Sequence, residues 1–133
     1  MKLETLLWAD FDRTVKHLTY YVSREWGFEI ENIVGRWRGG LPLAVALSHA
    51  LKLPLVTGIG PRTLYVTDVY YGDRPLPAMA PLYTVAWGIR EPMTCPDGLY
   101  AVYRVPADTW AVFPWTPYES SLESMKRFEK NKR

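Results

Sequence analysis

A glycine-containing segment between two apolar runs constrains this chain more than any other feature. Residues 33–35 read Ile-Val-Gly, Arg-Gly-Gly follows at residues 38–40, and residues 41–47 are apolar. The first run is typical of a buried strand and the last of a buried helix. Glycines let the backbone approach a ligand, and a helix start offers unpaired N–H groups and a positive dipole end. The segment therefore predicts a strand–turn–helix unit with an anion site, to which Arg38 adds a bidentate ligand.

The rest of the chain alternates strand-like and helix-like patterns. Apolar residues recur at spacings of three and four over residues 6–25, which predicts an amphipathic helix that Gly27 ends. The helix after Arg-Gly-Gly is expected at residues 41–51, and a loop at residues 88–98. Strands are expected at residues 31–35, 55–56, 63–69, 82–87, 99–105 and 110–113. This alternation predicts an α/β fold, with a doubly wound, mostly parallel sheet in a single domain.

The end of the chain differs in composition from the rest. Residues 118–133 are polar and charged, which favours an exposed, frayed helix. We expect one domain over residues 1–119 and a charged tail over residues 120–133. Residues 75–81 contain three prolines, so no long helix is expected there.

Composition excludes several classes of protein. The chain has 133 residues, 48% of them hydrophobic, which suits one globular domain. Its net charge of +2 is too small to indicate a nucleic-acid partner, and no apolar run is long enough to span a membrane. Cys95 is the only cysteine, so an intrachain disulfide is excluded. The N-terminus has no signal-peptide pattern, and we expect a reducing, cytoplasmic setting.

The Arg-Gly-Gly segment resembles the pyrophosphate-binding loop of type I phosphoribosyltransferases, in which a strand runs into Ala-Arg-Gly-Gly-Leu and a helix. The likeness is greatest to the purine branch, the xanthine-guanine and hypoxanthine enzymes. The resemblance implies that the substrates are phosphoribosyl diphosphate and a purine base. It implies that Trp37, Arg38, Gly39 and Gly40 bind pyrophosphate.

A second segment, Leu-Tyr-Val-Thr-Asp-Val-Tyr-Tyr-Gly-Asp-Arg at residues 64–74, resembles the phosphoribosyl diphosphate motif of the same family. That motif has two adjacent acids, which accept hydrogen bonds from the ribose hydroxyls. Thr67 stands at the first acid and Asp68 keeps the second. The resemblance implies that Asp68 holds Mg²⁺ together with the substrate, so Asp68 and Arg38 are the expected catalytic residues.

The remainder of this motif departs further from the family. Tyr71 stands where the third acid, the general base near the purine, is expected. Gly72 of the 5′-phosphate loop is kept, but Asp73 and Arg74 replace the flanking threonines. Arg74 offers a compensating cation, whereas Asp73 opposes a phosphate. The alternative for this segment is an ordinary strand that leads into a turn, with Asp68 as an acid at the start of the loop.

A third segment, residues 100–115, is similar to the end of xanthine-guanine-type enzymes, which carry Asp-x-Trp, an apolar pair and Phe-Pro-Trp before an acid. The resemblance implies that Trp110 stacks on the purine, with a place in the core as the equal alternative. Trp115 is expected in the core, and Thr116 replaces the acid. The family lysine that reads the purine O6 is absent, and Arg90 is the nearest cation.

Three functions remain open at this stage. The first is a purine phosphoribosyltransferase that uses Mg²⁺ and serves purine salvage. Family members form dimers or tetramers, so the resemblance allows a homo-oligomer, although no residue of the sequence requires one. The second is a catalytically impaired purine- or nucleotide-binding module on the same fold, which the loss of a ribose acid favours. The third is a structural or interaction protein. Residues 57–62 are too few for the closing loop that covers the active site in the family.

Overall fold

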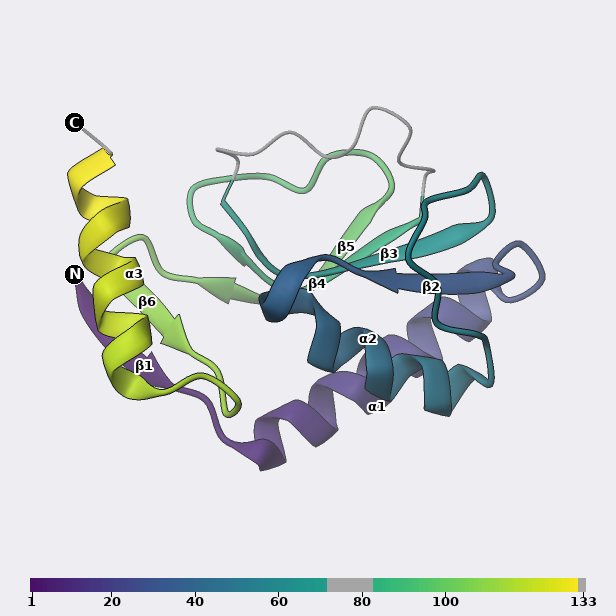
Figure 1. Cartoon of the computed structure of the whole chain (residues 1–133). Helices are drawn as coiled ribbons and strands as arrows, with labels where there is room; N and C mark the ends of the chain where they lie inside the picture. The colour runs from purple at the N-terminus through teal and green to yellow at the C-terminus, as the bar shows by residue number, and fades with distance from the viewer. Residues whose placement is uncertain (72–82, 132–133) are drawn as a thin grey trace.

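A computed structural model describes residues 1–71 and 83–131 of the chain, except for the side chain of Trp37 (Figure 1). In the described part, strands and helices follow one another in an α/β order. The elements are β1 (Lys2–Thr5), α1 (Trp8–Trp26), β2 (Asn32–Gly35), α2 (Trp37–Leu51), β3 (Thr63–Tyr70), β4 (Thr84–Arg90), β5 (Leu99–Val105), β6 (Thr109–Val112) and α3 (Tyr118–Asn131). The predicted single-domain α/β fold with parallel sheets is confirmed.

The main sheet has the strand order β2-β3-β4-β5, and all its pairs are parallel. Ile33 of β2 also forms a parallel bridge to Leu55, on the side away from β3. The chain therefore leaves β2, returns beside it at Leu55 and then crosses to β3 on the other side. Such a reversal is the switch point at which open parallel sheets bind ligands, beyond the carboxyl ends of the strands.

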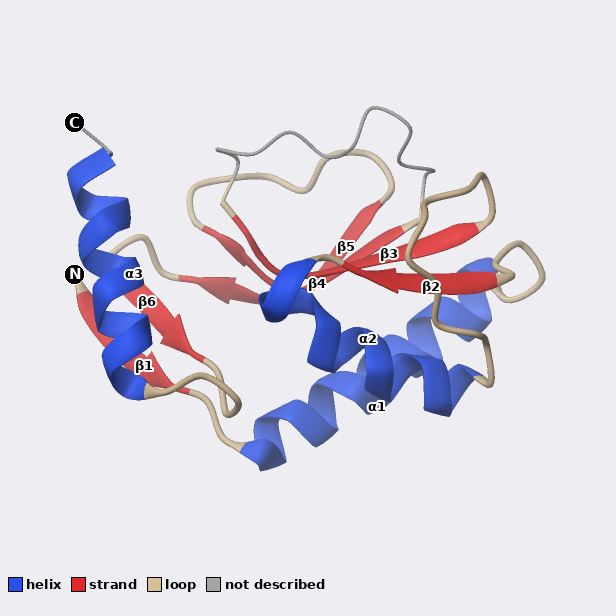
Figure 2. Cartoon of the chain, in the orientation of Figure 1, coloured by secondary structure: helices blue, strands red, loops and turns tan. Residues whose placement is uncertain are grey.

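Two helices cover one face of this sheet, as Figure 2 shows. The apolar face of α1 buries Leu18 and Val22, and α2 buries Leu43 and Leu47. Every residue of β4 is buried, which explains the apolar and small side chains of residues 84–89; Arg90, at the end of the strand, is a buried charge. The hydrophobic core therefore lies between the two helices and the sheet.

A second, two-stranded sheet joins the beginning of the chain to its end. Strand β1 pairs with β6 in parallel, with Leu3 opposite Trp110. Helix α3 packs against β6, and it lies beside the small sheet in Figure 1. The sequence patterns did not identify β1, because four residues with little alternation give too weak a signal.

Two expected boundaries are wrong. Helix α2 begins at Trp37, so Arg-Gly-Gly forms its first turn instead of a turn before it. Strand β4 extends to Arg90, so residues 88–90, expected in a loop, are strand. Gly88 interrupts the apolar pattern because β5 passes close by: a Cβ there would lie 3.0 Å from Cγ2 of Val105.

The expected C-terminal helix is present as α3, but one of its faces is buried. Ser121 and Met125 are buried on that face. The division of the chain at residue 119 stays a prediction. Residues 75–81 lie outside the described residues. None of the helices in the described part of the chain combines the length and apolar character that a membrane-spanning segment needs.

Candidate functional site

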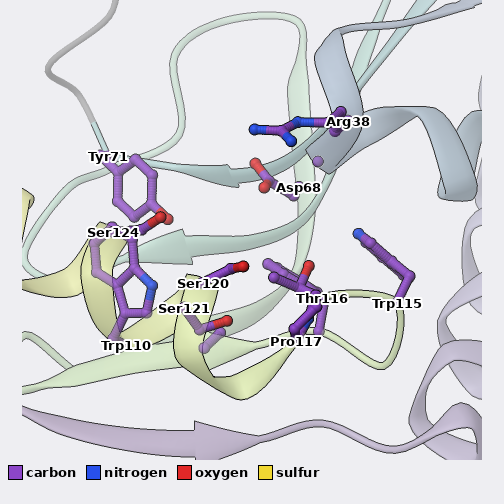
Figure 3. Close-up of a pocket in the computed structure, with 13 residues that line it drawn as sticks. Arg38, Asp68, Tyr71, Trp110, Trp115, Thr116, Pro117, Ser120, Ser121 and Ser124 are labelled. Carbon is purple, nitrogen blue, oxygen red and sulfur yellow. The ribbon is translucent and has the colours of Figure 1, made fainter.

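A cleft of about 390 Å³ opens beyond the carboxyl ends of the strands at the switch point (Figure 3). This volume is within the range of about 300–1,000 Å³ that ligand pockets occupy. Its walls come from the start of α2, the end of β3, strand β6 and the start of α3. The lining residues are Arg38, Gly39, Asp68, Tyr71, Trp110, Ala111, Phe113, Trp115, Thr116, Pro117, Ser120, Ser121 and Ser124. Five of the residues predicted from sequence, namely Arg38, Gly39, Asp68, Tyr71 and Trp110, thus meet in one cleft.

Arg38 and Asp68 face each other across one wall of this cleft (Figure 3). Arg38 is exposed in the first turn of α2, and the first bond of that turn is Gly40 N–H to the Arg36 carbonyl at 3.1 Å. The N–H groups of residues 37–39 precede this bond, so they have no acceptor within the helix. A guanidinium beside the positive end of a helix dipole is an arrangement that attracts a phosphate or pyrophosphate.

The two glycines of this turn are required for different reasons. A Cβ at Gly39 would overlap the Oδ2 atom of Asp68, so only glycine lets that carboxylate lie against the first turn of α2. A Cβ at Gly40 would lie 2.5 Å from the Val66 carbonyl oxygen, so Gly40 lets α2 pack on the backbone of β3. Gly39 therefore lines the cleft, whereas Gly40 packs on β3, and both residues lie within α2.

Asp68 is oriented by its own backbone. Its Oδ1 atom accepts a hydrogen bond of 2.6 Å from the N–H of Val69, and its other oxygen faces Gly39. Among the described residues, no group of three or more His, Cys, Asp or Glu side chains forms a metal site. A single carboxylate fits Mg²⁺ that arrives with a diphosphate, because this ion keeps several waters and uses substrate oxygens as ligands.

An aromatic stack closes one side of the cleft. The rings of Tyr71 and Trp110 lie parallel, with centroids 5.3 Å apart and planes inclined by 7°. The guanidinium of Arg90 lies over both rings and over Phe128 of α3, at 5.1–5.2 Å from each centroid. Arg90 is 5% exposed, and it donates a hydrogen bond of 3.2 Å to the Ala107 carbonyl.

This stack defines what Trp110 and Arg90 contact. Arg90 supports the stack from behind and is not part of the cleft lining. One face of Trp110 already contacts Tyr71, so a purine stacks on that face only if Tyr71 moves. The purine-binding roles of Trp110 and Arg90 stay predictions.

A second aromatic cluster forms the opposite wall. Trp115 packs against Trp8, Phe11, Trp87 and Phe113, with ring centroids 5.0–6.3 Å apart. Trp115 therefore packs against the core, as expected from the sequence, but it also lines the cleft. Its indole nitrogen is turned toward the cleft in Figure 3.

The start of α3 supplies a wall that the sequence patterns did not identify. Ser120, Ser121 and Ser124 of α3 line the cleft together with Thr116. Serines spaced along one face of a charged segment were the available signal. It was too weak to use because hydroxyls are common on exposed helices.

The other predicted residues lie beside the cleft or outside the described residues. Thr67 is half-buried in β3 and is not part of the lining, since it lies under Gly40, and its role in ribose binding stays a prediction. Gly72, Asp73 and Arg74 lie outside the described residues, as does the side chain of Trp37.

The fold matches solved purine phosphoribosyltransferases. The enzyme from Pyrococcus horikoshii superposes with a TM-score of 0.69 at 24% identity, over 89% of this chain and 97% of that one. Helicobacter pylori xanthine-guanine-hypoxanthine phosphoribosyltransferase gives a TM-score of 0.69 at 17% identity, over 92% and 99% of the two chains. No protein-family model and no curated protein matches the sequence. The chain therefore has the type I phosphoribosyltransferase fold that its motifs predicted.

A third solved structure carries a bound nucleotide. A hypothetical protein from Neisseria gonorrhoeae with bound ppGpp superposes with a TM-score of 0.57 at 13% identity, over 99% of this chain and 98% of that one. Proteins of this shape thus include enzymes named for purine phosphoribosyl transfer and a protein seen with a purine nucleotide.

Proposed function

We propose that this protein is a purine phosphoribosyltransferase, which binds phosphoribosyl diphosphate with Mg²⁺ and transfers ribose 5-phosphate to a purine base in purine salvage. The observation that carries the proposal is the meeting of Arg38, Gly39 and Asp68 at the start of α2, in a cleft also lined by Trp110. This arrangement offers donors for a diphosphate, a carboxylate for ribose hydroxyls and an aromatic surface for a base.

The reaction that fits this cleft breaks the bond between the anomeric carbon and a pyrophosphate oxygen. A bond forms between N9 of the purine and that carbon, pyrophosphate leaves with the bonding electron pair, and the N9 proton of the purine passes to water. Arg38 and the N–H groups of the first turn of α2 neutralise charge as it develops on the leaving group. Asp68 orients the ribose and would hold Mg²⁺, which supplies further neutralisation of the diphosphate when bound.

Calorimetric titration of phosphoribosyl diphosphate, with and without Mg²⁺, tests the proposal. Binding that requires Mg²⁺, followed by nucleotide formation from guanine, xanthine or hypoxanthine, is the expected result. Asp68→Asn is the matched variant, because it keeps the size of the side chain and removes its charge. Failure of the folded wild-type protein to bind the diphosphate at millimolar concentration would contradict the enzyme.

A nucleotide-binding module without catalysis is the second candidate. The parallel stack of Tyr71 on Trp110 favours it, because a tyrosine replaces the expected general base and occupies the face offered to a purine. The similarity to a protein with bound ppGpp agrees with this function. Titration with guanine nucleotides, monitored by tryptophan fluorescence, separates the two candidates: tight nucleotide binding without turnover of phosphoribosyl diphosphate identifies the module.

Self-association and location belong to the same proposal. A groove of about 570 Å³ beside the cleft is almost wholly apolar and includes Trp8, Leu41 and Val45, which are exposed. We expect a homo-oligomer, and sedimentation velocity at two protein concentrations measures it. The exposed thiol of Cys95 is compatible with a reducing, cytoplasmic setting.

A further inference from the structure

The ring of Tyr71 lies against the aromatic surface that the cleft offers to a ligand. Tyr71 follows the last residue of β3, Trp110 belongs to β6, and both half-buried side chains line the cleft (Figure 3). The two ring planes are inclined by 7°, and the centroids are 5.3 Å apart. Aromatic rings in direct contact have centroids about 4.5–7 Å apart, so no third ring fits between these two. A planar ligand therefore cannot stack on this face of Trp110 while Tyr71 is in place.

The guanidinium of Arg90 stabilises the position of the Tyr71 ring. Its Cζ atom is 5.1 Å from the ring centroid of Tyr71 and 5.2 Å from that of Trp110. Arg90 is 5% exposed, and a cation–π contact is stronger when the cation is desolvated. Tyr70 pairs with Ile89, so the next residue of each strand, Tyr71 and Arg90, lies at the same end of the sheet. The tyrosine ring thus makes two contacts, a stack on Trp110 and a cation–π contact with Arg90.

A purine ring can make both of these contacts in place of the phenol. Every nucleobase has a π-face that stacks on an aromatic side chain and attracts an arginine. Of the two stacked rings, that of Tyr71 is the one free to leave. Tyr71 lies beyond the last paired residue of β3, whereas Trp110 is paired with Leu3 of β1. Rotation about the Cα–Cβ bond of Tyr71 is therefore enough to expose the face of Trp110.

We propose that Tyr71 is an intramolecular competitor of the base, whose ring blocks the face of Trp110 until it rotates away. The identity of the ligand as a purine rests on the proposed function, whereas the block itself rests on the contacts of Tyr71. The apparent affinity for the base is lowered in proportion to the fraction of molecules in which the ring has moved. Arg38 and Asp68 lie on another side of the cleft (Figure 3), so the block acts on the base and not on a diphosphate.

Guanosine 5′-monophosphate (GMP) and ribose 5-phosphate, titrated separately by calorimetry, test the block, because only GMP carries a base. Tyr71→Ala removes the competing ring, so the Kd for GMP is expected to fall about tenfold, whereas the Kd for ribose 5-phosphate is expected to change by less than a factor of about two. Tyr71→Phe keeps a ring that stacks on Trp110. Its Kd for GMP is therefore expected to stay close to that of the wild type.

Three further variants complete the test. Tyr71→Leu keeps an apolar side chain that cannot stack, so it is expected to bind GMP more tightly than the wild type and to report on the block if Tyr71→Ala does not fold. Combining Tyr71→Ala with Trp110→Ala is expected to remove the gain, because the base then has no ring to stack on. Tyr20→Ala removes an exposed tyrosine of α1 that is not part of the cleft lining, and it is expected to bind GMP like the wild type.

The outcomes separate the block from the proposed function. Folded Tyr71→Ala or Tyr71→Leu protein that binds GMP no more tightly than the wild type overturns the block, even if phosphoribosyl diphosphate is turned over. An equal gain for ribose 5-phosphate overturns it as well, because the ring would then obstruct the cleft as a whole. Conversely, a gain for GMP that depends on Trp110 supports the block even if the protein does not bind phosphoribosyl diphosphate.

Discussion

The position of Gly39 determines what the carboxylate of Asp68 can do. Because Gly39 has no Cβ, the carboxylate lies against the first turn of α2, close to donors that attract anions. A carboxylate in this place would compete with a bound phosphate unless a cation came between them. The pair therefore suits a ligand that arrives with a divalent ion.

Gly39→Ala is expected to weaken ligand binding more than it lowers the stability of the protein. Alanine has a higher helix propensity than glycine, by about 1 kcal/mol, which offsets part of the cost of moving the Asp68 side chain. The displaced carboxylate is expected to lower Mg²⁺-dependent diphosphate affinity at least about tenfold, as measured by calorimetry. Gly58→Ala is the matched control, because a Cβ there meets no atom within 4 Å. Equal affinity in the two variants would contradict the arrangement proposed for Asp68.

Arg38→Ala is expected to abolish pyrophosphate binding and leave the melting temperature almost unchanged. Arg38 is exposed at the edge of the cleft, so it contributes little to packing. Calorimetry measures the affinity for pyrophosphate, and thermal denaturation measures the melting temperature. Arg24→Ala removes an exposed arginine from α1 and serves as the control for charge. A large loss of stability in Arg38→Ala alone would identify Arg38 as a structural residue.

The motifs predicted which residues line the same cleft. They did not predict the contacts that the side chains of those residues make. Arg38, Asp68 and Trp110 were assigned to one site because their motifs follow the order of a known family, and they do line one cleft. The burial of Arg90 among three rings could not be predicted, because it depends on Phe128, which is distant in sequence. Side-chain contacts between remote elements leave no local pattern in a sequence.

At the scale of elements, α3 does more than end the chain. Its serines line the cleft, and Phe128 contacts Trp110, Tyr71 and Arg90. A helix with so few buried residues depends on these contacts for its position. The geometry of one cleft wall is therefore coupled to the aromatic stack.

Phe128→Ala is expected to destabilise the protein by about 1–3 kcal/mol, because a half-buried ring that contacts three groups is lost. Urea denaturation measures the change. Phe28→Ala is the control, since Phe28 is 98% exposed and its removal is expected to cost less than about 0.5 kcal/mol. Similar values for the two variants would show that α3 is not held by this contact.

Element types were predictable, whereas several boundaries were not. Periodicity identified α1 and the strands of the main sheet, because each buries one face or both. In the sequence, the glycines of Arg-Gly-Gly and Gly88 indicate turns. In the structure, Arg-Gly-Gly lies in α2 and Gly88 lies in β4. A Cβ at Gly40 would overlap the backbone of β3, and a Cβ at Gly88 would be in tight contact with Val105 of β5, so both glycines reflect the proximity of a neighbouring strand, which is a tertiary effect.

At the scale of the whole molecule, stability is expected to depend on pH above neutrality. Tyr21 of α1 stacks on Tyr100 of β5, with ring centroids 3.6 Å apart. Burial, and next the charge of Glu25, raise the pKa of Tyr21 above its ordinary value of 10.0. The folded protein therefore binds the phenol proton more tightly than the unfolded chain does. This contribution to stability is complete below about pH 10 and is lost as the pH rises through the folded-state pKa.

Urea denaturation from about pH 8 to pH 11 checks this expectation. The free energy of unfolding of the wild type is expected to decline above about pH 10, and that of Tyr21→Phe to decline less. Tyr118→Phe, at an exposed tyrosine, is the control. Parallel profiles for the wild type and Tyr21→Phe would contradict the role assigned to Tyr21.

The order of the three motifs along the chain predicted the overall fold better than any single motif did. A strand, an Arg-Gly-Gly helix start, an acid at the end of a second strand and an aromatic end define a parallel sheet with a switch point. The two-stranded sheet was not foreseen. Its strands are four residues each, and β1 (Lys2–Thr5) is far in sequence from β6 (Thr109–Val112), so local patterns gave no sign of their pairing.

The pairing of β1 with β6 has a consequence for biosynthesis. The strand that carries Trp110 is held by residues 2–5, which are synthesised long before it, and it is covered by α3, which is synthesised after it. A nascent chain can therefore form the main sheet while β1 is still unpaired. The cleft is completed only after β6 and α3 have been made, so chains that stop before β6 would carry an unpaired strand and lack two walls of the cleft.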